Sequence, residues 1–173
     1  MTDYTLSRYG RDDLPTIRQT LLDVHADAYG EQMHDPFHQR FPWFVDTWGS
    51  LSTFDCVIAY DGDEPAGFAY GASANPGREW WREHLSPAPN PDTTFALSEL
   101  MVRPKWRKTG LSKSLHDHLL RSRPETLTVL LVDTAQPRVQ ALYEAWGYHK
   151  VGERQPFPDS PRCAVMLHGL PEA

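Results

Sequence analysis

Cysteine is scarce in this chain, and so are long apolar runs. Two cysteines, Cys56 and Cys163, stand among 173 residues. Two are too few for a disulfide framework, and both fall in segments that read as strands, so we expect reduced core thiols rather than nucleophiles. The longest apolar run, Leu127 to Val132 with Thr128 inside it, is far too short to span a bilayer. The first residues lack a basic start followed by an apolar stretch. We therefore expect a cytoplasmic protein that makes no contact with a membrane.

Positive charge is scarce in the first half of the chain. No lysine precedes Lys105, and residues 1–65 contain twelve acidic residues but only four positively charged residues, all arginines. The formal net charge of the whole chain is -6, which argues against nucleic acid as a partner. The acidic half either binds a cationic ligand or forms a solvated face that favours solubility, and both interpretations stay open.

One short segment reverses this sign of charge. The loop that joins an expected strand (Phe95–Val102) to an expected helix (Leu111–Arg121) contains Gly110. Such a loop presents free backbone N–H groups at the positive end of a helix dipole. Between residues 103 and 113 there are five basic residues and no acid: Arg103, Lys105, Arg107, Lys108 and Lys113. The pattern predicts a site for phosphate or another anion.

Glycine is too rare around this loop for two well-known phosphate sites. Gly110 is the only glycine in the region. A nucleoside-triphosphate loop needs G-x-x-x-x-G-K-[ST], and a dinucleotide fingerprint needs three glycines. Both kinds of site are excluded by spacing.

Periodicity and turn signals predict seven strands and four helices in one domain over residues 1–173. Asp12 or Asp13 is expected to cap the first helix and Gly30 to end it. The expected elements are strand Tyr4–Tyr9, a helix with the apolar stripe Leu14, Ile17, Leu21, Val24 and Ala28, helix Phe37–Leu51, strands Phe54–Tyr60, Ala66–Ala72 and Phe95–Val102, helix Leu111–Arg121, strand Leu127–Val132, a helix with the apolar stripe Val139, Leu142, Tyr143 and Trp146, and strands Tyr148–Val151 and Cys163–Leu167.

The order of these elements indicates a mixed sheet. A strand, helix and strand over residues 95–132 imply a parallel pair, whereas the Asp-Gly turn after residue 60 implies an antiparallel hairpin. We expect an α/β (α+β) fold with helices on both faces of the sheet. The long segment 73–93 carries Trp80 and Trp81, which either wall a pocket or anchor the loop.

Two segments resemble landmarks of the GNAT superfamily of N-acetyltransferases. Val102–Ser112 looks like the acyl-CoA signature V-x-P-x-x-R-x-x-G-x-G/A, and Ala141–Tyr148 looks like the helix that carries L-Y and ends in G-F or G-Y. The order and spacing of the two landmarks also match. The sequence departs from the family at Ser112, where glycine or alanine is usual, and at Gln136, where asparagine is frequent.

The resemblance implies a GNAT-like sheet of about seven mostly antiparallel strands and an activity that moves an acetyl group from acetyl-CoA to a primary amine in a ternary complex. It implies that backbone N–H groups of residues 108–113, with the charges of Arg107 and Lys108, hold the pyrophosphate. A backbone N–H near Met101 or Val102 would stabilise the oxyanion. The implied cofactor-binding residues are Met101, Val102, Arg107, Lys108, Thr109, Gly110, Leu111, Ser112 and Gln136.

Glu99 is the candidate general base. It occupies an otherwise apolar strand position beside Leu97 and Met101. A partly desolvated carboxylate there would have a raised pKa and could accept the proton of the amine directly or through water. The alternatives are an ion pair with a neighbouring strand and a role in orienting the substrate.

Tyr143 is the candidate general acid, because it matches the family's tyrosine that points at the sulfur. A phenol with a pKa near ~10 can protonate a thiolate whose conjugate acid has a pKa of about 8.5. Periodicity alone would make Tyr143 a core residue of its helix.

The acceptor and the partners are less defined. A small-molecule or peptide amine is expected, cationic if the acids Asp23, Asp27, Glu31 and Asp35 attract it. His34 and His38 have i, i+4 spacing, but Pro36 lies between them and a third ligand is missing, so no metal site is expected. His116 and His118, two residues apart on a helix, cannot face one ligand. A homodimer, a longer acyl donor and a non-catalytic acyl-CoA-binding or sensor module remain open alternatives.

Overall fold

The computed structural model describes residues 3–171 and contains seven strands. Their order in the sheet is β1-β2-β3-β4-β5-β7-β6. The chain divides into two compact units. Unit 1 holds the residues up to Ala72 together with Ser98–Arg123, and unit 2 holds Ser73–Leu97 together with the residues from Pro124 onward. Within the described part of the chain, no helix is long and apolar enough to cross a membrane.

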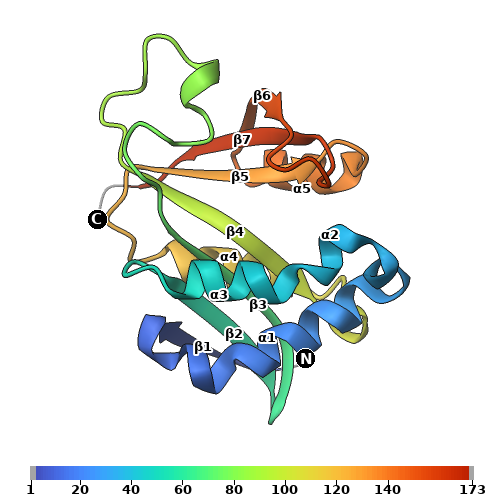
Figure 1. Ribbon diagram of the computed structural model, residues 1–173. Helices are drawn as coiled ribbons and strands as arrows, with labels where there is room; N and C mark the ends of the chain where they lie inside the picture. Colours follow the sequence, from blue (N-terminus) through green and yellow to red (C-terminus); the bar gives the residue numbers. More distant parts are fainter. Residues whose placement is uncertain (1–2, 172–173) are drawn as a thin grey trace. The chain divides into compact units, whose positions relative to one another are not determined.

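Unit 1 is an antiparallel meander with helices on both faces. Strands β1, β2 and β3 pair in sequence order, and the Asp-Gly turn expected between β2 and β3 is present, with Gly62 at φ 60°. Figure 1 shows α1 and α3 on one side of these strands and α4 on the other. The elements are β1 (Tyr4–Gly10), α1 (Leu14–Tyr29), α2 (Pro36–Gln39), α3 (Phe41–Gly49), β2 (Asp55–Asp61), β3 (Glu64–Ser73) and α4 (Leu111–Leu120), together with the part of β4 (Thr94–Val102) that begins at Ser98.

Apolar stripes on the helices of unit 1 form its core. Ile17, Leu21 and Val24 of α1 are buried against Ile58 and Phe68 of the sheet. The stripe of α4 is buried as the spacing predicts: Leu111, Leu115 and Leu119. A side chain of this size contributes roughly 1.5–3 kcal/mol when it is buried.

Two details of unit 1 differ from the expectation. The segment Phe37–Leu51 is not one helix, because the chain leaves helical geometry at Arg40 and restarts with Pro42 in the first turn of α3, where a missing N–H costs nothing. Asp13 precedes α1 as expected, but its Oδ2 accepts a hydrogen bond from the backbone N–H of Gly10 at 2.8 Å instead of capping the helix.

Unit 2 contains the parallel pair that the strand-helix-strand pattern predicts. Strand β4 pairs with β5 through three residue pairs, from Thr94↔Leu127 to Ala96↔Val129. Strand β7 then lies between β5 and β6 and is antiparallel to both. The remaining elements are β5 (Leu127–Asp133), α5 (Pro137–Ala145), β6 (His149–Arg154) and β7 (Cys163–Gly169).

The expected apolar stripe of α5 is wrong in part. Val139 and Leu142 are 39% and 42% exposed, and Tyr143 is the buried residue of the helix. Helical spacing shows which residues share a face, but it does not show how much of that face a neighbouring element covers.

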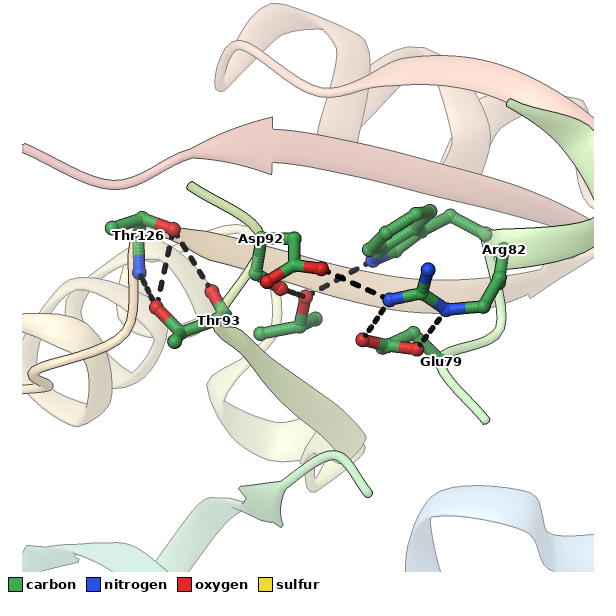
Figure 2. A network of polar contacts seen from close by, with 7 residues as sticks. Glu79, Arg82, Asp92, Thr93 and Thr126 are labelled. Carbon is green, nitrogen blue, oxygen red and sulfur yellow. Dashed lines mark hydrogen bonds and ion pairs between the residues drawn. The ribbon is translucent and has the colours of Figure 1, made fainter. Parts of the chain in front are cut away.

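The long segment after β3 is firmly anchored in unit 2. Trp81 is fully buried, and its Nε1 donates to Thr94 Oγ1 at 3.0 Å. Figure 2 shows Arg82 donating to both carboxylate oxygens of Glu79, at 2.6 and 2.7 Å, and to Asp92 at 3.0 Å. These contacts support the interpretation that the second tryptophan anchors the loop.

Candidate active site

The basic loop follows the end of β4 in unit 1 and is held in place by Trp106. This side chain is 5% exposed, and its Nε1 donates to Asp61 Oδ2 at 2.9 Å. Thr109 Oγ1 donates to the carbonyl of Trp106 at 2.7 Å. A tryptophan in the signature therefore fixes the loop to β2, at the turn between β2 and β3.

Two residues of the loop have left-handed backbone geometry, Lys108 with φ 63° and Gly110 with φ 83°. Gly110 occupies the N-cap position of α4 and, as a glycine, has no side chain that could cap this helix start. A Cβ built on Gly110 would meet nothing within 4 Å, so the space beside it is open. The first N–H groups of a helix are a favourable position for an anion, and a glycine N-cap leaves room for one beside this helix start.

Arg107 has contacts that the sequence did not reveal. Its Nη2 donates to the carbonyl of Ala28 at 2.7 Å, and its Nε donates to the carbonyl of Val102 at 3.3 Å. Ala28 lies in the last turn of α1, where a positive charge is favourable. Arg107 therefore ties the loop to α1, and its contact with a pyrophosphate stays a prediction.

Strand β4 contains one extra residue relative to β3. The two strands are joined by the bonds Ala74 N to Thr94 O and Arg103 N to Ala66 O. Eight steps separate Ala66 from Ala74, whereas nine separate Thr94 from Arg103. An extra residue of this kind indicates a β-bulge in β4.

Gly67 allows the end of β4 to approach β3 closely. A Cβ at Gly67 would lie 2.6 Å from the carbonyl oxygen of Met101 and 3.1 Å from Cα of Val102. These are the two residues whose backbone is expected to stabilise the oxyanion. Any larger residue at position 67 would displace that backbone.

Glu99 lies on β4 between Leu97 and Met101, which are 3% and 7% exposed. Burial raises the pKa of Glu99 to about 8. Within the described residues, the Glu99 carboxyl has no ion pair or hydrogen bond to a basic side chain. The expected raised pKa is therefore present, and the alternative of an ion pair with a neighbouring strand is not observed.

Tyr143 and Gln136 belong to unit 2, whereas Glu99 and the basic loop belong to unit 1. Tyr143 is 8% exposed, and its ring packs edge-on against Trp146 and Tyr148 at centroid distances of 5.1 and 5.7 Å. Gln136 is exposed at the N-cap position of α5, with no side-chain hydrogen bond to the helix start.

The four acids considered for a cationic acceptor are not equally available. Asp23 accepts from Gln19 Nε2 at 2.9 Å, and Asp27 lies 3.7 Å from Arg103 Nε. Asp35 caps α2 by accepting from the N–H of Phe37 at 2.9 Å. Only Glu31 has no such contact among residues 3–171, so three of the four carboxylates already serve the fold.

His25 is a buried polar residue that the sequence reasoning missed. It is 3% exposed, and its ring stacks on Phe41 at a centroid distance of 3.9 Å. Desolvation, with a smaller contribution from His38, lowers the pKa of His25 to about 4. Its position four residues after Leu21 on the apolar stripe of α1 was the available signal. Among the described residues, no group of three or more His, Cys, Asp or Glu side chains could hold a metal ion.

Comparison with known proteins supports one family. The model of the acetyltransferase (GNAT) family matches residues 17–148. None of the curated proteins compared matches the chain.

Three solved structures illustrate the fold. The ribosomal-protein-S18-alanine N-acetyltransferase of Escherichia coli is 19% identical, with 99% of this chain and 96% of that chain covered and a TM-score of 0.66. NAA60 of Arabidopsis thaliana, in complex with a bisubstrate analogue, is 14% identical, with 99% and 100% covered and a TM-score of 0.68. The PaiA N-acetyltransferase of Thermoplasma acidophilum, in complex with coenzyme A, is 10% identical, with 97% and 99% covered and a TM-score of 0.59. At these identities the likeness concerns the fold, while the family match over residues 17–148 covers both landmarks in full. The chain belongs to the GNAT family of acetyltransferases.

Proposed function

We propose that this protein transfers the acetyl group of acetyl-CoA to a primary amine by direct attack in a ternary complex. The observation that carries the proposal is the family match over residues 17–148, together with the position of Glu99 on the strand that leads into the anion loop. Burial raises the pKa of Glu99 to about 8. A base with a pKa near the working pH is suited to accept a proton from an amine.

The loop after β4 fits the pyrophosphate of coenzyme A. The N-cap residue of its helix is a glycine without a capping side chain, and the space beside Gly110 is open. The N–H groups of residues 108–113 and the charge of Lys108 would hold the diphosphate, with Arg107 positioning the loop. When bound, acetyl-CoA supplies an acetyl thioester.

Glu99 and Tyr143 divide the proton transfers between them in this proposal. Glu99 accepts the proton that the amine loses as the new C–N bond forms. Backbone N–H groups near Met101 and Val102 stabilise the oxyanion. Tyr143 donates its phenol proton to the sulfur as the C–S bond breaks, and solvent reprotonates the phenol.

The acceptor class, the compartment and the assembly extend this proposal. We expect a small-molecule or peptide amine, and of the four acids considered Glu31 is the one free to attract a cationic acceptor. Two buried thiols, Cys56 and Cys163, are compatible with a reducing cytoplasmic compartment. The two units belong to one domain in this proposal, because the residues of β4 run from one unit into the other. A homodimer stays a prediction.

Release of free thiol from acetyl-CoA over a panel of small amines and peptide amines tests the proposal. We expect turnover with at least one amine and a loss of about 10²-fold to 10⁴-fold in Glu99→Gln and in Tyr143→Phe. Tyr148→Phe is the matched control, because Tyr148 is also buried and its ring packs against Tyr143. Wild-type turnover in both site variants would refute these roles, while binding of coenzyme A without turnover by any amine would favour the non-catalytic module.

A further inference from the structure

A polar cavity of about 470 Å³ lies in unit 2. Its walls come from the short 3-10 helix η3 (Arg82–His84), from the end of β6 and from the residue that follows β6. The volume falls within the range of small-molecule sites, and none of the residues that line the cavity has a role in the proposed acetyl transfer. The lining residues are Glu83, His84, Glu153, Arg154 and Gln155.

The chain fixes both walls of this cavity. A Cβ built on Gly152 of β6 would collide with the imidazole of His84, so a glycine at this position lets η3 lie directly on the strand. On the other side, Gln155 Nε2 donates to the carbonyl of Ser160 at 2.9 Å, and the N–H of Phe157 donates to Ser160 Oγ at 3.1 Å. The turn after β6 is therefore held by contacts of its own.

Two basic side chains of the cavity have a buried nitrogen atom without a hydrogen bond in the described part of the chain, His84 Nε2 and Arg154 Nε. His84 Nε2 lies 3.4 Å from Glu83 Oε1. The half-buried side chain of Arg154 has neither an ion pair nor a hydrogen bond among residues 3–171. Since partly buried charges in folded proteins are normally paired, Arg154 calls for an anionic group that the fold does not supply.

Of the two carboxylates at the cavity, one is already occupied and one is accessible. Glu153 accepts hydrogen bonds from Lys150 and, at 2.7 Å, from Arg162, and these two partners lower its pKa. The Glu83 side chain is 63% exposed, and its contact with His84 is its one ion pair within the described residues. The cavity therefore presents one uncompensated cation, Arg154, and one accessible carboxylate, Glu83.

We propose that this cavity binds a small zwitterion of the amino-acid class, with a carboxylate and an ammonium group. The guanidinium of Arg154 would hold the carboxylate by two parallel N–H···O bonds, with His84 as a further donor, and Glu83 would attract the ammonium group. A phosphate dianion fits less well, because Glu83 would repel it. The proposal uses neither Glu99 nor the anion loop, so it is independent of acetyl transfer.

The test is an NMR titration of the full-length, ¹⁵N-labelled protein with the common free L-amino acids, one at a time and without acetyl-CoA. For the amino acid that binds most tightly, the analogue without the ammonium group, the analogue without the carboxylate and inorganic phosphate are titrated as well. We expect saturable shifts of the amides of residues 83, 84 and 153–155, and an affinity for the amino acid at least about tenfold above that for each of the other three probes. No saturable shift with any amino acid, or phosphate binding as tightly as the amino acid, would overturn the proposal.

Three variants identify the groups that bind. Arg154→Gln should weaken binding roughly 10-fold to 100-fold, and Arg154→Lys should lose less, because lysine keeps the charge but not the planar fork. Glu83→Gln should weaken binding of the amino acid but not of the analogue without the ammonium group.

Arg138→Gln is the matched control, because Arg138 is an exposed arginine of unit 2 that is not part of the cavity wall. Its affinity for the amino acid should equal that of the wild type. Unchanged affinity in Arg154→Gln, or an equal loss in Arg138→Gln, would contradict the site. Arg154 has no partner among the described residues, so its variants should fold, which their ¹⁵N spectra report directly. Because the titration needs no turnover, failure of this proposal and failure of the proposed acetyl transfer are distinguishable.

Discussion

At the scale of single residues, ionisation of Glu99 lowers the stability of the folded protein. A carboxyl between buried Leu97 and Met101 resists ionisation, and burial raises its pKa from 4.5 to about 8. The sequence predicted this environment because a lone acid interrupts an apolar strand. It did not predict Arg107 on the carbonyl of Ala28, because this contact joins residues far apart in the chain.

Glu99 should make the protein less stable as the pH rises. Between pH 4.5 and about 8, the unfolded chain has lost the proton that folded Glu99 keeps, so the free energy of unfolding falls through this window. The slope is at most ~1.4 kcal/mol for each pH unit. Glu99→Gln removes this pH-dependent loss of stability. The melting temperature of the variant relative to that of the wild type should therefore rise between pH 5 and pH 9. Parallel curves of melting temperature against pH would contradict the raised pKa.

At the scale of elements, the start of α4 depends on a left-handed glycine. Gly110→Ala places a Cβ in open space, so the cost is conformational, about 1–2 kcal/mol of stability. We also expect weaker binding of coenzyme A, because the N–H groups of the loop lose their orientation. Calorimetric titration with coenzyme A measures this effect.

Gly62→Ala is the matched control for Gly110→Ala. Gly62 has φ 60° and equally open surroundings, but it lies in the turn between β2 and β3. The two variants should lose similar stability, and only Gly110→Ala should lose affinity. Equal affinities for coenzyme A in the two variants would contradict the proposal that the loop binds the cofactor.

The connection between β3 and β4 should loosen when its arginine is removed. Arg82 joins Glu79 to Asp92 across the 20 residues between Ser73 and Thr94. Arg82→Ala should increase hydrogen exchange of the amides in this segment. Arg78→Ala, which removes an exposed arginine of the same segment, should not. Unchanged exchange in Arg82→Ala would assign the anchoring to Trp81 alone.

The limits of sequence reasoning are clear at the scale of elements. All seven strands follow from alternation and turn signals, within a few residues at each end. The break at Arg40 was missed because aromatic residues continue through it, while the break itself is a matter of local backbone geometry. The exposure of Val139 and Leu142 depends on which neighbouring elements cover α5. The spacing of residues within the helix does not contain this information.

At the scale of the whole molecule, the anion loop differs from the rest of the chain in the sign of its charge. The formal net charge is -6, yet residues 103–113 carry five basic residues and no acid. One of the five, Arg107, donates to backbone carbonyls, and Lys105 lies 3.7 Å from Glu64, so part of this charge serves the fold. The family match over residues 17–148 agrees with a site for coenzyme A.

Calorimetric titration of the wild-type protein with coenzyme A tests the role of the loop most directly. We predict saturable one-to-one binding at or below millimolar concentration, weakened by added salt because charges and helix N–H groups hold the diphosphate. No heat of binding at millimolar coenzyme A would contradict the assignment of the loop and, with it, the proposed acetyl transfer.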